Sequence, residues 1–388
     1  MKDVKQKDML CRHFGSQDWY VQPEVKVFHR GGLLEHKKPI TDIDVLALRP
    51  GANLNWELVL GDCRTLKGQS PVNRAIWLRG LMEYFSASSG VILLQKKQPI
   101  EQDHKLFAAS LGIALLDESE FLTYDKALIY PSGSSNFPLS LENLYELSKI
   151  THRYPSLKSF GEYIYILSWN EPNRLELIRK VIGEGQNISR EIDPKKTDHL
   201  SLVLEAAGLF AIGLAECVGI IFNQYLKPEK LGQLDDALKV IIWGGRSQYE
   251  FIAKLRSDFM EAKGIQPKSG GVLALPYWDK FLQLVRNMLE APRTAFSVPQ
   301  ILRRAAIDVN QGNAFLSNTN STDLLLIKLA MLTSEYLCRA SKFPADTMDA
   351  LLSLFAKKQS EIVHSPNKTT QPGHDHEMRT QQEKPKLD

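Results

Sequence analysis

The alternation of apolar and polar positions changes character near residue 125. Before that point, short apolar runs of strand length alternate with helix-like segments. After about Tyr130, apolar residues recur at three- and four-residue spacing almost throughout. The pattern predicts an α/β N-terminal domain over residues 1–125, with a mixed sheet flanked by helices, followed by a mainly α-helical domain over residues 126–364.

The first domain is expected to contain five strands and three helices. Ser70 followed by Pro71 has the form of a helix N-cap with proline at the first helical position. The helix that follows places apolar residues, Ile76 and Met82 among them, on a face that would pack on the sheet. Strands are expected at 19–28, 40–48, 54–63, 90–94 and 112–116, and helices at 5–13, 72–85 and 103–111.

The second domain is expected to be helical from end to end. The segment at 298–309 carries Arg303 and Arg304, which fit either an ordinary surface helix or a contact to nucleic acid. Residues 365–388 are polar, include three prolines and contain almost no apolar residues, so we expect a disordered tail. Helices are expected at 141–151, 157–170, 174–182, 198–225, 230–242, 249–262, 277–290, 298–309, 322–340 and 345–361.

One apolar run, residues 202–222, has about the length of a membrane span. It contains Glu205 and Glu216, which would be costly at bilayer depth, and glycines suited to close helix packing. We therefore expect a buried helix of a soluble bundle and no contact with a membrane.

Composition sets limits on function. The chain is 43% hydrophobic and 24% charged, as in ordinary soluble proteins, and its formal net charge of +3 is too small for bulk electrostatic coating of nucleic acid. Its four cysteines are far apart and form no CxxC pair, which indicates reduced thiols. With no secretory signal pattern at the N-terminus, a cytoplasmic location is expected.

Acidic residues stand at corresponding places on two successive predicted strands. Asp44 lies in the run Thr-Asp-Ile-Asp-Val-Leu-Ala-Leu, and Asp62 ends the next strand, with Arg64 two residues further on. Two converging carboxylates provide the hard oxygen ligands that Mg²⁺ prefers. A cation on the same strand face can stabilise charge that develops on a phosphate.

This arrangement resembles the PD-(D/E)XK, or restriction-endonuclease-like, nuclease superfamily over residues 18–120. The resemblance implies that Asp44 and Asp62 hold Mg²⁺ or Mn²⁺, which would bind a scissile phosphate and activate water. Asp42, two residues from Asp44 and on the same strand face, is an auxiliary candidate. Glu24 is a further candidate, or else a solvated strand carboxylate.

The chain departs from the family pattern where lysine is expected and Arg64 stands. Arginine keeps its proton and cannot serve as a general base, although it can hold a phosphate. Lys67, three residues on, is the candidate to replace the missing lysine, and Gln69 either orients a water or faces solvent.

Two basic features flank the proposed site. Lys26, Arg30, Lys37 and Lys38 lie on a predicted hairpin that could follow a phosphate backbone, or could be a solvated turn. Arg74, in the first turn of the predicted helix after Ser70, could contact phosphate, or could belong to an ordinary capped helix.

The leading hypothesis is a metal-dependent nuclease that hydrolyses phosphodiester bonds, with DNA as the expected substrate by analogy with the family. The alternative is a catalytically degenerate core that acts as a nucleic-acid- or protein-binding module, with Arg64 as the visible lesion. A third interpretation makes the acidic strands purely structural. The helical domain offers no chemistry of its own and fits a protein partner or a homo-oligomer contact.

Overall fold

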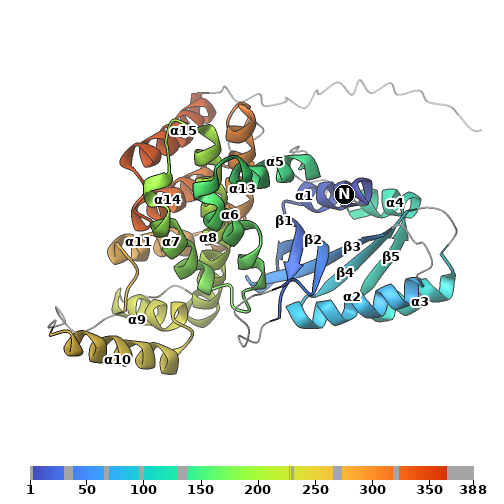
Figure 1. Cartoon of the computed structure of the whole chain (residues 1–388), viewed down its shortest axis with the longest axis horizontal. Helices are drawn as coiled ribbons and strands as arrows, with labels where there is room; N and C mark the ends of the chain where they lie inside the picture. The colour runs from blue at the N-terminus through green and yellow to red at the C-terminus, as the bar shows by residue number, and fades with distance from the viewer. Residues whose placement is uncertain are drawn as a thin grey trace, which may run out of the picture.

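A computed structural model describes residues 3–29, 38–64, 70–95, 100–128, 139–226, 228, 231–264, 273–317 and 323–364. Figure 1 shows an α/β region beside a helical region, with strand β1 on the side of the sheet nearest the helices. The expected arginine–lysine hairpin from Arg30 to Lys37, the residues Lys67 and Gln69, and the predicted tail at 365–388 lie outside the described residues.

The α/β region is built on a five-stranded mixed sheet, as the sequence predicted. The strand order is β1-β2-β3-β4-β5. The first three strands form an antiparallel meander, and the last two join in parallel through helical crossovers. The strands are β1 (Tyr20–Val27), β2 (Thr41–Pro50), β3 (Trp56–Arg64), β4 (Ser89–Leu94) and β5 (Ile113–Asp117).

Helices cover both faces of this sheet. Helices α1 (Val4–Ser16) and α4 (Glu118–Leu128) lie on one side, and α2 (Pro71–Phe85) and α3 (Gln102–Ser110) on the other (Figure 1). Helix α1 sits close on the sheet because Gly61 has no side chain, and a Cβ there would lie 2.7 Å from Leu10 Cδ1.

Helix α2 starts as predicted, and its predicted buried face is confirmed in part. The Ser70 hydroxyl accepts a hydrogen bond from the Val72 amide, and Pro71 opens the helix. Its buried stripe is Ala75, Leu78, Met82 and Phe85, which follows the helical repeat from Ala75. Ile76 lies one position off this stripe and is 54% exposed, so the prediction that it packs on the sheet was wrong.

The C-terminal region is helical, as predicted, and surrounds the long helix α8 (Thr197–Tyr225) (Figure 1). The expected helix at 157–170 is divided, since α6 ends at Tyr165 and a 3-10 turn follows. The other elements are α5 (Leu141–Arg153), η1 (Pro155–Leu157), α6 (Lys158–Tyr165), η2 (Leu167–Asn170), α7 (Glu176–Asn187), η3 (Ser189–Glu191), α9 (Leu231–Ile242), α10 (Arg246–Ala262), α11 (Trp278–Leu289), α12 (Pro292–Ala295), α13 (Val298–Gln311), α14 (Leu324–Ala340) and α15 (Ala345–His364).

Helix α8 is long and apolar enough to cross a membrane, but 89% of its most apolar window is buried inside the protein. Its glycines allow close approach of neighbouring backbone. A Cβ at Gly213 would lie 2.7 Å from the Arg174 carbonyl oxygen, and one at Gly219 would collide with the Leu54 carbonyl oxygen. The burial predicted for the run at 202–222 is confirmed.

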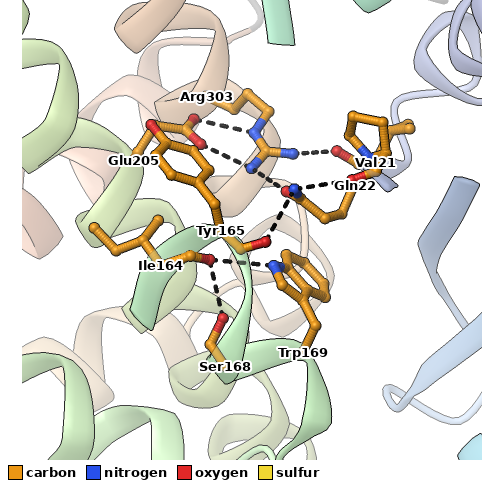
Figure 2. Close-up of polar contacts among 9 residues, drawn as sticks. Val21, Gln22, Ile164, Tyr165, Ser168, Trp169, Glu205 and Arg303 are labelled. Carbon is orange, nitrogen blue, oxygen red and sulfur yellow. Dashed lines mark hydrogen bonds and ion pairs between the residues drawn. The ribbon is translucent and has the colours of Figure 1, made fainter. Parts of the chain in front are cut away.

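A buried ion pair between α13 and α8 is also hydrogen-bonded to β1 (Figure 2). The Arg303 guanidinium donates to both carboxylate oxygens of Glu205, at 3.0 and 2.8 Å. It also donates to the Val21 carbonyl oxygen and, at 3.2 Å, to Gln22 Oε1, and lies 3.8 Å from the centre of the Tyr20 ring. Arg303 is 1% exposed, and its charge is paired inside the protein. Both interpretations of this residue, a surface helix and a nucleic-acid contact, were therefore wrong.

Candidate functional site

Strand pairing brings the two predicted metal ligands together. In the β2–β3 ladder Val45 lies opposite Gly61, and continuing this register by one residue places Asp44 opposite Asp62. The two strands separate at this point, where the Asp44 carboxylate accepts a hydrogen bond from the Cys63 amide at 2.8 Å. The Cys63 thiol is fully buried.

Asp44 is held by a lysine that sequence analysis missed. Lys7, in the first turns of α1, places its Nζ 2.8 Å from Asp44 Oδ1 and also forms an ion pair with Glu24. Burial opposes the charge on Lys7, but the carboxylates of Asp44 and Glu24 more than compensate and raise its pKa above the usual range. Lys7 is therefore a protonated cation in the folded protein.

Asp62 is held by two arginines. Arg74 Nε donates to Asp62 Oδ2 at 3.0 Å, and Arg74 Nη2 donates to Asp62 Oδ1 at 2.5 Å, in the bidentate geometry typical of strong arginine–carboxylate pairs. Arg64 Nε lies 3.2 Å from Asp62 Oδ1. The Arg74 guanidinium also lies 3.8 Å from the centre of the Trp77 ring, which fixes its plane.

Burial dominates the acid–base balance of Asp62. Removal from water raises its pKa, Arg74 and Arg64 act in the opposite direction, and nearby Asp44 adds to the increase, so that the net shift is upward. Asp62 is only 1% exposed, and Asp44 is 2% exposed. Each carboxylate oxygen of the pair is bonded by a cation or by a backbone amide.

These residues, as arranged, do not fit Mg²⁺ or Mn²⁺. Such an ion needs carboxylate oxygens that face it and room for several waters. Here the carboxylates of Asp44, Asp62 and Glu24 are balanced by the three cations Lys7, Arg64 and Arg74. Across the described residues, no group of three or more His, Cys, Asp or Glu side chains is placed to hold a metal ion.

The remaining predicted site residues lie around this cluster. Asp42 lies opposite Lys26 in the β1–β2 ladder. Lys38 is exposed and precedes the first residue of β2. Arg64 is itself partly buried, which opposes its charge, but Asp62, Asp44 and Asp42 together raise its pKa. Glu24 belongs to the ion-pair cluster and is not the freely solvated carboxylate considered as an alternative.

A signal for Lys7 was present in the sequence. Lys7, Leu10, Cys11 and Phe14 are spaced so that they share one face of the first helix. The apolar members of this face pack on the sheet, so Lys7 must point the same way.

Comparisons with known proteins give no match: no protein-family model, no curated protein and no solved structure matches this chain. The resemblance to the PD-(D/E)XK superfamily that the sequence suggests therefore stays a prediction.

Proposed function

We propose that the α/β region is a nuclease-like core that has lost metal-dependent cleavage and serves as a nucleic-acid-binding module. The observation that carries this proposal is the complete pairing of Asp44 and Asp62. The oxygens that a metal would need are bonded by Lys7, Arg74 and the Cys63 amide, and Arg64 adds an ion pair to Asp62.

The energetics of burial support the loss of the metal. An ion that took over Asp62 would have to displace Arg74, whose side chain is only 12% exposed, and leave its charge unpaired. Breaking a buried ion pair in this way costs about 3–5 kcal/mol. Arg64 cannot supply a general base in compensation.

The case for nucleic acid as the ligand rests on local positive charge. Lys26 and Lys38 stand at the two ends of the predicted basic hairpin, beside the carboxylate cluster. Arg64 keeps 30% of its side chain exposed at the end of β3. Contacts of this kind to phosphates give binding that weakens as salt is raised.

A second candidate is the active metal-dependent nuclease, and one observation favours it. Lys7 places a primary ammonium 2.8 Å from Asp44, where it could supply the charge that the expected lysine would give. In that case a metal would have to rearrange Arg74 on binding.

Incubation with single- and double-stranded DNA and RNA in Mg²⁺ or Mn²⁺ separates the two candidates. The first predicts salt-dependent binding, with DNA as the primary ligand, and no cleavage. The double variant Lys26→Ala/Lys38→Ala should weaken binding several-fold and reduce its salt slope by about 2, whereas Lys254→Ala on the distant helix α10 should not. Cleavage that is lost in Asp62→Asn would establish the second candidate, and the absence of any nucleic-acid binding would overturn both.

A further inference from the structure

A large cleft lies at the opposite end of the sheet from the carboxylate cluster. Its volume is about 800 Å³, within the size range of small-molecule sites. It is walled by the starts of β3, β4 and β5, the end of α1, helix α4 and the turn before α13. Glu57 on the cleft wall and Asp62 in the cluster are five residues apart on β3, roughly 17 Å at the usual strand rise.

Two arginines with unused donors face this cleft from different parts of the fold. Arg49, at the end of β2, bonds Glu57 through Nε at 2.8 Å and lies 5.4 Å from the centre of the Trp19 ring. Arg293, in α12, donates through Nη1 to the Gly51 carbonyl oxygen at 3.2 Å. Among the described residues, neither guanidinium makes a further hydrogen bond. Each is held in place by one bond and keeps its other N–H donors available to a ligand.

One arginine of the cleft wall has no acidic partner and favours an anion. Glu57 is paired with Arg49, and Asp18 is paired with Arg304. The four charged residues of the cleft wall, Asp18, Arg49, Glu57 and Arg293, sum to zero formal charge. Within the described part of the chain Arg293 forms no ion pair, so its guanidinium provides a local positive charge beside Gly51. Guanidinium groups bind phosphate and carboxylate oxygens strongly, often through two donors.

The inner wall of the cleft favours a ligand with a planar ring system. Tyr124 and Trp19 contribute half-buried aromatic rings, and Val59, Val91 and Ala114 contribute aliphatic surface from the sheet. Aromatic side chains with apolar neighbours bind flat rings well, because a ring presents a π-face to them.

We propose that this cleft binds a small planar anion of the nucleoside monophosphate class. Its ring system lies against Tyr124 and the aliphatic wall, and its phosphate lies between Arg49 and Arg293. The site joins the α/β region to the helical region and does not depend on the function proposed for the carboxylate cluster.

Calorimetric titration of the full chain tests this assignment, with AMP, GMP, CMP and UMP as probes. We expect saturable one-site binding of at least one of them. Adenosine lacks the phosphate that the arginines bind, and inorganic phosphate lacks the ring that stacks on the cleft wall. Each should bind at least tenfold more weakly, since a charge-assisted hydrogen bond and a base–aromatic stack are each worth about that factor.

Two variants locate the site. Arg293→Ala removes the unpaired guanidinium and should weaken binding about tenfold, and Ala52→Trp, in an exposed position on the cleft rim, should abolish binding by filling the space. Arg246→Ala on α10 and Asn53→Trp, next to Ala52, are the matched controls, and unchanged near-ultraviolet circular dichroism verifies that each variant is folded. Failure of all four nucleotides to bind at millimolar concentration, or binding unaffected by either test variant, would overturn the assignment.

Discussion

At the scale of single residues, the ion pair between Asp62 and Arg74 determines whether the carboxylate at the end of β3 is available to a ligand. Asp62 is buried, and Arg74 is its bidentate partner. Arg74→Met should therefore cost about 3 kcal/mol of unfolding free energy, because it leaves a buried carboxylate with Arg64 alone. Urea unfolding followed by circular dichroism measures this loss.

Arg79→Met on the same helix is the matched control. Its partner Glu83 lies one turn away, the two side chains are 42% and 67% exposed, and Arg79 otherwise makes only a 3.4 Å contact to the Leu111 carbonyl oxygen. Exposed pairs of this kind contribute about 0.5 kcal/mol or less. Equal losses in the two variants would show that the Asp62 pair is no more important than a surface contact.

A second prediction at this scale concerns Asp308, a buried acid of α13 that accepts a hydrogen bond from the Leu316 amide at 2.9 Å. Burial raises its pKa from 3.8 to about 6, against the opposing effects of that hydrogen bond and of Arg304. A folded-state pKa above the unfolded value means that the stabilising contribution exists below pH 3.8 and is lost as the pH rises through 6.

Asp308→Asn removes this titration while keeping an acceptor for Leu316. The free energy of unfolding of the wild type, minus that of Asp308→Asn, should therefore fall between pH 4 and pH 6 and be constant above about pH 7. Urea unfolding of both proteins across this range provides the measurement. A difference that does not change with pH would contradict the raised pKa.

The central residues of the cluster could be predicted from sequence only in part. Alternation along two adjacent strands was enough to expect that Asp44 and Asp62 converge. Their cationic partners could not be assigned, because Lys7 and Arg74 come from helices on opposite sides of the sheet. Periodicity determines which face of a helix is buried, but not which strand residue each side chain meets.

At the scale of elements, glycines show where close packing is required. Gly219 of α8 faces the Leu54 carbonyl oxygen, and an added methyl group would have to push this backbone away. Gly219→Ala should cost about 1–3 kcal/mol through overpacking. Gly80 of α2 has no atom within 4 Å of an added Cβ, so Gly80→Ala should instead stabilise by up to about 1 kcal/mol.

Thermal unfolding of the two alanine variants gives the comparison directly. We expect opposite signs for the change in melting temperature, since both residues lie inside helices and only Gly219 is crowded. A stabilising Gly219→Ala would contradict the close approach of α8 to the turn before β3.

Element prediction worked best where the periodic signal was long. The strands and most helices end close to the predicted residues, whereas α4 was not predicted because, of its eleven residues, only Phe121 is buried. Such a helix gives almost no amphipathic pattern to detect. Ile76 was wrongly assigned to the buried face of α2 for a related reason, since apolar residues occur on several sides of this helix.

At the scale of the whole molecule, the two regions share one continuous hydrophobic core. The Trp56 indole of β3 donates to the Ile212 carbonyl oxygen of α8 at 2.9 Å, and Arg303 of α13 binds the Val21 carbonyl of β1. Residues 1–128 expressed alone should therefore lack cooperative thermal unfolding and a dispersed amide NMR spectrum. A well-dispersed spectrum with a sharp transition would show that the α/β region folds independently.

The most direct test of the central claim is titration of Mn²⁺ into the wild-type protein, followed by paramagnetic resonance, with Asp62→Asn measured alongside. Because Lys7, Arg64 and Arg74 neutralise the carboxylates, we predict no saturable binding at millimolar Mn²⁺ and no difference between the two proteins. Saturable binding by the wild type that disappears in Asp62→Asn would contradict this account and restore the metal-dependent nuclease.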